Sequence, residues 1–192
     1  MIQPGTPGVS GLAERTTADT DGDVRRILEK LESTGQLLTV SRLVANSPAL
    51  FRAFVLFSDG ILTRSRLPGD LRELCILRLA ALKDAEYEWA EHVGFSSRAG
   101  VTDEQRHALA EGRLPEGVDD DRLAALAAVE KLAEGGGWSA EDWDDLRARF
   151  GPDGAIDLVM IAGWYGGVVP VLTKALGLEP DNATYSQKGR AT

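Results

Sequence analysis

The spacing of apolar residues predicts helices along most of the chain. Val24, Ile27, Leu28 and Leu31 recur at the interval that places side chains on one helix face. Residues 121–134 are rich in Ala and Leu, which favour helix. Further helical stretches are predicted at residues 37–45, 48–62, 71–82, 86–99, 101–112, 138–151 and 154–177. The pattern therefore predicts an all-α, single-domain fold of about seven or eight helices.

Capping residues mark the ends of these predicted helices. Pro48 follows Ser47 at one helix start, and Thr102 stands three residues before Gln105 in a capping-box arrangement. The other expected caps are Asp70 and Ser139 at helix starts and Gly100 at a helix end.

The last predicted helix, residues 154–177, is apolar on nearly all of its faces. Such a helix is expected to lie at the centre of a protein or at an interface. Its "GGVVPVL" segment also contains strand-forming residues, but Pro170 argues against a strand.

Both ends of the chain differ in composition from the helical region. Residues 1–21 are rich in Gly, Pro, Thr and Asp and lack periodicity, so a mobile N-terminal tail is expected there. The helical domain is expected to span residues 22–180, followed by a C-terminal tail at 181–192.

The composition limits which binding partners and which cellular compartment are expected. The net charge of −9 argues against binding to a nucleic-acid backbone, which needs a basic surface. No apolar run is expected to approach the roughly 18–20 residues of a membrane span, and the N-terminus lacks a secretory pattern. A single cysteine, Cys75, excludes an internal disulfide framework. Together these features predict no membrane partner and a cytoplasmic location.

The segment "EYEWAEH", Glu86–His92, combines three carboxylates with one of the two histidines of the chain. If the helices on either side of Lys83–Ala85 fold back on each other, Glu73 and His92 lie at similar distances from the turn and can meet. Glu88 lies four residues before His92 on the same helix face. We therefore predict a Glu73–Glu88–His92 constellation suited to general acid–base chemistry.

A purely structural role for the same pair is the alternative, since helical proteins also bury carboxylate–histidine pairs for stability. A metal site is not favoured, because no second histidine accompanies Glu88 and His92 and no HExxH pattern exists. The other histidine, His107, is expected to be solvated on a charged helix.

At these residues the sequence resembles the carboxymuconolactone decarboxylase family, which shares a fold with alkylhydroperoxidase D-like proteins. The resemblance rests on Arg72–Glu73, Glu86–Trp89, His92 and Arg98–Gly100, and it extends over about residues 43–180. It implies a helical domain of that fold and a homo-oligomer, either a trimer or a hexamer. It also implies a small-molecule substrate and no cofactor.

The proteins that this sequence resembles fall into two branches with different activities. The peroxidase branch carries a Cys-x-x-Cys motif where this chain has Ala85 and Glu88, so thiol chemistry is not expected at this site. Cys75 lies in the apolar helix, where a cysteine is normally inert. The decarboxylase branch keeps Glu88 and His92 but has histidine where this chain has Tyr87. That departure argues against the muconolactone itself as substrate.

The resulting functional prediction is a decarboxylase-like enzyme that moves protons on a small organic substrate, either a carboxylated compound or a lactone. Glu73, Glu88 and His92 are the predicted catalytic residues.

Arg72 and Arg78 are the nearest cations for an acidic substrate, although ion pairing at a surface or interface is the alternative. Trp164 and Tyr165 are expected to line the pocket or to pack in the core. The predicted substrate-binding residues are Arg72, Glu86, Tyr87, Trp89, Trp164 and Tyr165. A peroxidase-like activity and a non-catalytic, ligand-binding oligomer remain as alternatives.

Overall fold

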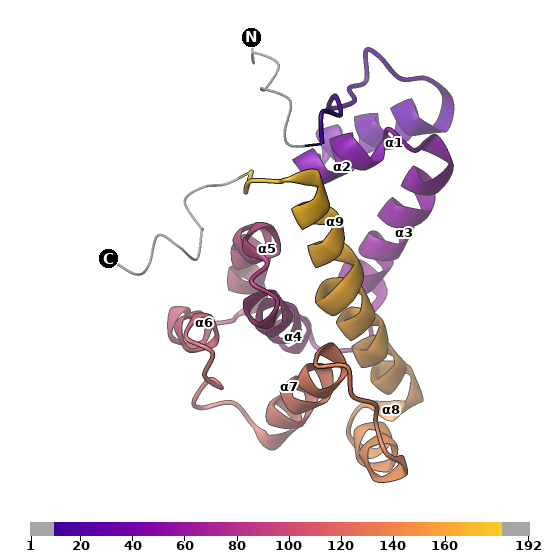
Figure 1. Ribbon diagram of the computed structural model, residues 1–192. Helices are drawn as coiled ribbons and strands as arrows, with labels where there is room; N and C mark the ends of the chain where they lie inside the picture. Colours follow the sequence, from indigo (N-terminus) through magenta and orange to yellow (C-terminus); the bar gives the residue numbers. More distant parts are fainter. Residues whose placement is uncertain (1–9, 182–192) are drawn as a thin grey trace.

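The computed structural model describes residues 10–181, and all of the regular structure in that range is helical (Figure 1). The all-α prediction is therefore confirmed. The helices are α1 (Gly22–Ser33), α2 (Thr39–Val44), α3 (Pro48–Arg64), α4 (Gly69–Leu82), α5 (Glu86–Ala99), α6 (Asp103–Ala110), α7 (Asp120–Ala133), α8 (Ala140–Gly163), the π-helix η1 (Trp164–Val168) and α9 (Val169–Leu176).

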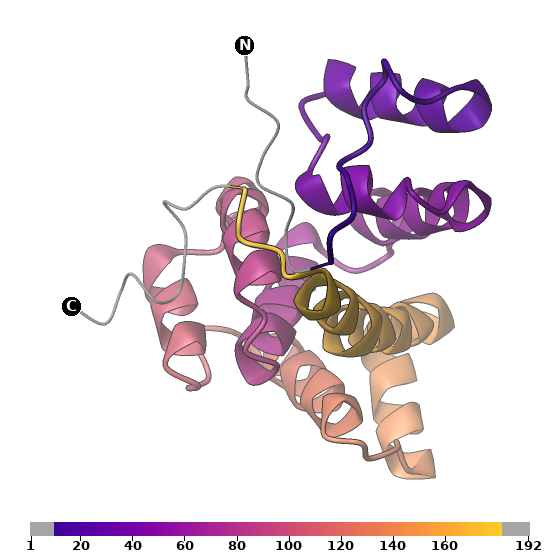
Figure 2. The same cartoon turned by 45° about the horizontal axis from the view of Figure 1, so that its top comes forward.

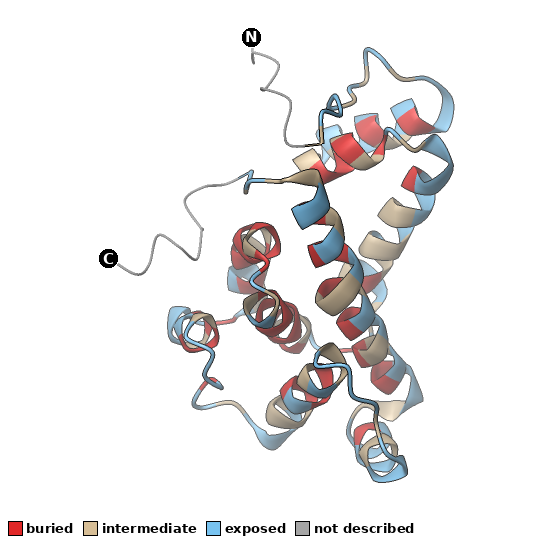
Figure 3. Cartoon of the chain, viewed as in Figure 1, coloured by how far each residue is buried: buried red, intermediate tan, exposed pale blue. Residues whose placement is uncertain are grey.

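Helix α4 is the centre of the main core. It packs against α5, α6, α7, α8 and η1, and most of its length is buried (Figure 3). Leu74, Ile76, Leu77 and Leu79 point in different directions around the helix, yet none of them is exposed to solvent. A helix that is apolar on all sides is stable only when other elements surround it, which explains its central position.

The N-terminal helices form a second, smaller apolar cluster. Val24 and Leu28 of α1 pack with Ala45 and with Phe51 of α3, separately from the main core. Figure 2 shows α1, α2 and α3 grouped at one side of the molecule. Helix α3 connects this group to the rest through its contacts with α8.

Most of the predicted caps are confirmed. Thr102 with Gln105, and Ser139 with Asp142, form complete capping boxes, and Gly100 ends α5 in the left-handed conformation with φ 96°. Ser47 occupies the N-cap position of α3, but its side chain makes no capping hydrogen bond.

The predicted cap at Asp70 is wrong. Pro68 occupies the N-cap position of α4, and Asp70 lies in the first helical turn. Its carboxylate instead accepts hydrogen bonds from Arg122 of α7, with an Nε–Oδ2 distance of 2.7 Å. A tertiary contact therefore takes the side chain that local sequence assigns to capping.

The long C-terminal helix has two breaks in its geometry. Gly151 interrupts α8 with φ 70° and ψ 171°, directly before Pro152, so the predicted boundary between residues 151 and 154 is confirmed as a kink. The π-helix η1 then joins α8 to α9. Residues 166–172, which contain strand-forming side chains, are helical.

One face of this helical stretch is buried and the other carries exposed apolar side chains. Within residues 10–181, Ala140–Leu176 is one stretch long and apolar enough, by length and composition alone, to cross a membrane. The expectation that no apolar run reaches that length is therefore wrong, because the apolar residues continue through η1 into α9. Core helices of other proteins satisfy the same criterion. The exposed apolar residues of this face are Ile156, Met160, Val168 and Val171.

The segments outside the helical region are partly held against it. Residues 10–21 contain no helix, and Asn46 Nδ2 donates to the carbonyl of Ala13 at 2.8 Å. At the other end, Asp181 accepts hydrogen bonds from the Thr39 backbone N–H (2.9 Å) and the Tyr87 hydroxyl (2.7 Å). Asp181 falls in the predicted C-terminal tail, yet it fastens the chain to α2 and α5. The remainder of both predicted tails, residues 1–9 and 182–192, lies outside the described residues.

Candidate active site

Helices α4 and α5 form the antiparallel hairpin that the sequence predicts. The turn between them is tight: Asp84 adopts φ 48°, and the Ala85 N–H donates to the carbonyl of Ala80 at 2.8 Å. Asp is one of the few residues that tolerate this left-handed conformation. Because each helix rises by a fixed amount per residue, the turn brings Glu73 of α4 opposite His92 of α5. His92 Nδ1 lies 2.9 Å from Glu73 Oε2, so this predicted contact is confirmed.

Glu73 is a fully buried carboxylate with two partners. Burial raises its pKa, but His92 and then Arg72 lower it, and the net shift is downward from the ordinary value of 4.5. Arg72 Nε lies 3.2 Å from Glu73 Oε1, the carboxylate oxygen that His92 does not contact. Glu73 is therefore ionised, and the nitrogen of His92 that faces it acts as the donor.

This arrangement leaves Nε2 of His92 as the ring nitrogen that Glu73 does not use. A carboxylate bound to Nδ1–H fixes the tautomer of the ring and leaves the other nitrogen as a proton acceptor. His92 is only 6% exposed, so water has little access to it. The pair has the composition of a general base held in place by a buried anion.

Two aromatic rings enclose His92. Tyr165 of η1 meets the imidazole edge-on, with ring centroids 5.0 Å apart and an interplanar angle of 85°. Phe95, one turn further along α5, lies 5.5 Å away. Burial raises the pKa of the Tyr165 hydroxyl, which therefore stays protonated.

The π-helix positions Tyr165. A π-helical turn widens the helix and shifts the direction of the side chains that follow, and such turns are frequent at functional sites. Gly166 lets this turn approach α4, since a Cβ atom at that position would lie 3.1 Å from Leu79 Cδ2. The glycine after Tyr165 thus has a packing role in the site.

Glu88 lies one turn before His92 and is 2% exposed. Neither of its carboxylate oxygens makes a hydrogen bond of good geometry within the described residues. Thr173 of α9 is close enough to interact with it, but its hydroxyl already donates to the carbonyl of Val169 at 3.0 Å. Burial raises the pKa of Glu88, and this effect outweighs the lowering by the backbone N–H of Glu88, by Thr173 and by the charges of His92 and Lys174. Glu88 is therefore more easily protonated than a solvated glutamate.

The other predicted substrate-binding residues lie in different environments. The hydroxyl of Tyr87 is used by Asp181 and by the Val40 N–H (3.3 Å). Trp89 is fully buried in the main core, and Trp164 packs on Phe57 of α3 with ring centroids 4.6 Å apart. Glu86 is half-buried in the first turn of α5. Of this predicted set, Arg72 forms an ion pair with Glu73 and Tyr165 packs on His92. Substrate binding stays a prediction for all six.

Arg78 does not join the site. It is 7% exposed and forms an ion pair with Glu130 of α7. Arg72 pairs with Glu73 and Arg78 pairs with Glu130, so both arginines form ion pairs within one chain. The sequence suggested ion pairs at a surface or an interface.

Three residues at or near the site were not predicted. Phe95 lies three positions after His92, and its helical spacing was a usable signal. Thr173 and Asp181 come from the far end of the chain, and nothing in their local sequence indicates contact with α5.

Cys75 is fully buried in α4, and burial raises the pKa of its thiol above the ordinary value of 9.0. A thiol held in its protonated form is a poor nucleophile, which agrees with the inert role expected for it. It is the single cysteine of the chain, so no dithiol can form within one molecule.

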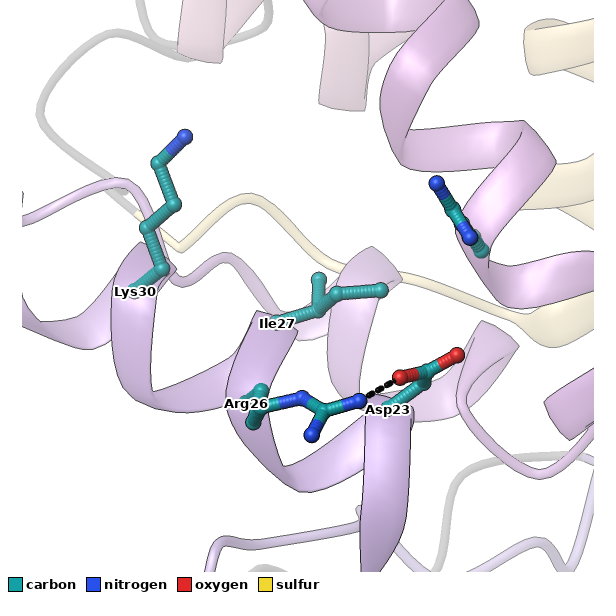
Figure 4. Close-up of a pocket in the computed structure, with 5 residues that line it drawn as sticks. Asp23, Arg26, Ile27 and Lys30 are labelled. Carbon is teal, nitrogen blue, oxygen red and sulfur yellow. Dashed lines mark hydrogen bonds and ion pairs between the residues drawn. The ribbon is translucent and has the colours of Figure 1, made fainter.

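A separate surface pocket lies between α1 and α3 (Figure 4). It has a volume of about 420 Å³, and Asp23 at its edge forms an ion pair with Arg26. Ile27, Lys30 and Arg52 line the remainder. This pocket contains none of the predicted site residues.

The fold and the buried pair define an all-helical protein with a histidine–carboxylate site inside a helical hairpin. Residues 48–136 match the model of the carboxymuconolactone decarboxylase family, which confirms the resemblance over α3 to α7, the hairpin included. No curated protein sequence matches the chain.

Solved structures share the alkylhydroperoxidase D-like fold. The chain is similar to a peroxidase-related protein with an alkylhydroperoxidase AhpD core from Ralstonia eutropha JMP134, with 22% identity and a TM-score of 0.75 over 90% of this chain and 92% of that one. A peroxidase-related protein from Silicibacter sp. TM1040 matches with 18% identity and a TM-score of 0.74 over 96% and 97%. The debrominase Bmp8, solved as a cysteine-to-alanine variant with 2,3,4-tribromopyrrole, matches with 18% identity and a TM-score of 0.64 over 79% and 81%. At these identities the likeness establishes the fold alone.

Proposed function

We propose that the chain is an enzyme of the carboxymuconolactone decarboxylase-like group that transfers protons on a small organic substrate. The observation that supports this most is the 2.9 Å contact between His92 Nδ1 and Glu73 Oε2 in a buried site. Glu73 holds the imidazole, Nε2 exchanges a proton with the substrate, and Glu88 supplies a second acidic group on the same helix face.

The reaction class is proton transfer at a carbon atom next to a carbonyl group. In a decarboxylation, the bond to the carboxylate breaks, CO2 leaves, and the imidazolium of His92 protonates the resulting carbanion. In an isomerisation, neutral His92 removes a proton from carbon and returns it at another position. Both reactions gain from a site that excludes water, because the charges that develop interact more strongly there.

Several observations support this function over a peroxidase. The buried Cys75 thiol cannot supply a dithiol reaction, and Glu88 stands where the peroxidase branch has its second cysteine. The similar debrominase was solved with tribromopyrrole, a small ring compound, so the fold accommodates ligands of this size. No metal or organic cofactor is part of the proposed mechanism.

The active form is proposed to be a homo-oligomer in the cytoplasm. The exposed apolar face of Ile156, Met160, Val168 and Val171 would then be covered by another copy of the chain. Sedimentation at several protein concentrations measures this directly. A species that remains monomeric at every concentration would contradict it.

The function is tested by following solvent deuterium into a panel of lactones, ketones and carboxylated lactones by NMR. The protein should accelerate exchange or turnover of at least one compound, and His92→Asn should reduce the rate at least about 100-fold. Asparagine retains a donor that can reach Glu73 but has no basic nitrogen. Treatment with a thiol alkylator should leave the rate unchanged. Activity that survives His92→Asn would refute the proposed role of the pair.

A further inference from the structure

The charges of the candidate site cancel within the site itself. Arg72 is the cation in contact with it, and its Nε lies 3.2 Å from Glu73 Oε1. Glu88 is enclosed without an ion-pair partner among the described residues. Arg72 is therefore already neutralised, and an incoming anion would lie close to the Glu73 carboxylate.

The other cations of this region already have partners. Arg98 lies over the ring of Phe95, 4.7 Å from its centroid, and that ring in turn packs on His92. Lys174 donates to the carbonyl of Lys83, and Arg78 pairs with Glu130. A carboxylated substrate would thus lose its hydration without gaining a cation in return, which is costly in a buried site.

From this charge balance we propose that the site takes an uncharged carbonyl compound, a ketone or lactone, and moves a proton between two of its atoms. The proposal rests on the proposed function and selects the isomerisation over the decarboxylation. His92 and Glu88 are spaced i, i+4, with Cβ atoms about 5–6 Å apart, so both can reach one small molecule. Because both oxygens of Glu88 are covered, the substrate displaces the side chains around them when it binds.

The proton shift needs no other reactant. Nε2 of His92 removes a proton from the carbon next to the carbonyl group, and the C–H electron pair forms a C=C bond. The carbonyl π pair takes the proton of the uncharged Glu88 carboxyl, which gives an enol, an imidazolium and a Glu88 carboxylate. In a β,γ-unsaturated substrate, the imidazolium then protonates the γ-carbon, and Glu88 regains its proton as the carbonyl group re-forms. The product is the conjugated isomer, and both side chains return to their starting states.

Two matched probes test the proposal on the unmodified protein. α-Angelica lactone is an uncharged β,γ-unsaturated lactone, and its carboxymethyl homologue has the same ring with an added carboxylate. Isomerisation is followed by ultraviolet absorbance, and deuterium uptake from D2O by NMR. The uncharged lactone should be processed with a kcat/KM at least about 10-fold higher than that of the carboxylated one.

Variants separate this proposal from the proposed function. Glu88→Gln has the shape of the protonated acid but cannot transfer its proton, so isomerisation of the uncharged probe should fall at least about 10-fold. Glu116→Gln, an exposed position, should match the wild type. Equal or faster turnover of the carboxylated probe, still abolished by His92→Asn, would overturn the uncharged-substrate proposal and leave the proposed function intact. No turnover of either probe, or turnover unaffected by His92→Asn, would overturn both. The comparison of probes on the wild type stands even if Glu88→Gln fails to fold.

Discussion

The two histidines of the chain each contact a glutamate, but in opposite surroundings. His92 contacts Glu73 at 2.9 Å, with side-chain exposures of 8% and 0%. His107 lies 3.2 Å from Glu111, with exposures of 58% and 46%. The distances are similar, so the difference between the pairs is their access to water.

Access to water decides what each pair can do. At the surface, water screens both charges, and the pair contributes little to stability or to chemistry. Inside the hairpin, Glu73 is held ionised between Arg72 and His92, and the imidazole has one fixed orientation. The same two side-chain types therefore form a candidate catalytic site in one place and a solvated pair in the other.

Removing the buried carboxylate should have the largest effect on stability. Glu73→Ala leaves Arg72 without its partner in a site that is mostly closed to water, and breaking such a buried pair costs about 3–5 kcal/mol. Urea unfolding of the variant and the wild type measures this difference. A loss below about 1 kcal/mol would mean that the carboxylate is far better hydrated than its burial indicates.

A smaller loss of stability is expected when the Tyr87 hydroxyl, which bonds to Asp181, is removed. Tyr87→Phe removes hydrogen bonds to Asp181 and Val40 and should cost about 1–2 kcal/mol in the same unfolding experiment. Tyr165→Phe is the matched control, because Tyr165 contacts His92 through its ring. Equal losses in the two variants would contradict the assigned role of Tyr87.

The two buried carboxyl groups should give opposite pH dependence. The pKa of Glu88 is raised in the folded state, so its contribution to stability falls as pH rises from about 4.5 through the raised value. The pKa of Glu73 is lowered, so its contribution is present above 4.5 and is lost as pH falls through the lowered value. Glu88→Gln should remove the first slope, which cannot exceed about 1.4 kcal/mol per pH unit for a single proton. Parallel stability curves for wild type and variant between about pH 4 and pH 8 would show that Glu88 ionises normally.

Substitutions in the exposed His107–Glu111 pair should have the smallest effect on stability. Glu111→Ala and His107→Asn should each unfold at the wild-type urea concentration, at low and at high salt, since both side chains are largely solvated. A clear loss of stability in either variant would remove the contrast between the two pairs.

The sequence carried enough information for the hairpin, but not for all of its surroundings. The contact between Glu73 and His92 follows from the rise per residue and the position of the turn, which are local properties. The sequence also indicates Tyr165 as a pocket residue, yet its placement against His92 depends on a π-helical turn and on close packing at Gly166. The apolar periodicity of a helix does not predict that change in geometry.

Long-range contacts account for the remaining differences. Asp70 has the sequence context of a cap, but Arg122, far along the chain, holds its carboxylate. Asp181 follows the last helix and has the composition of a tail, yet it bonds to α2 and α5. Such partners are fixed by the packing of whole helices and are not encoded in neighbouring residues.

If only the buried histidine transfers protons, the rate of solvent-deuterium incorporation into α-angelica lactone depends on His92 and not on His107. The rate is measured for the wild type, His92→Asn and His107→Asn under identical conditions, with folding of each protein checked by circular dichroism. We predict that His92→Asn loses at least about 100-fold in rate, while His107→Asn stays within about twofold of the wild type. Equal rates for the two variants would show that the buried His92 has no special role in proton transfer.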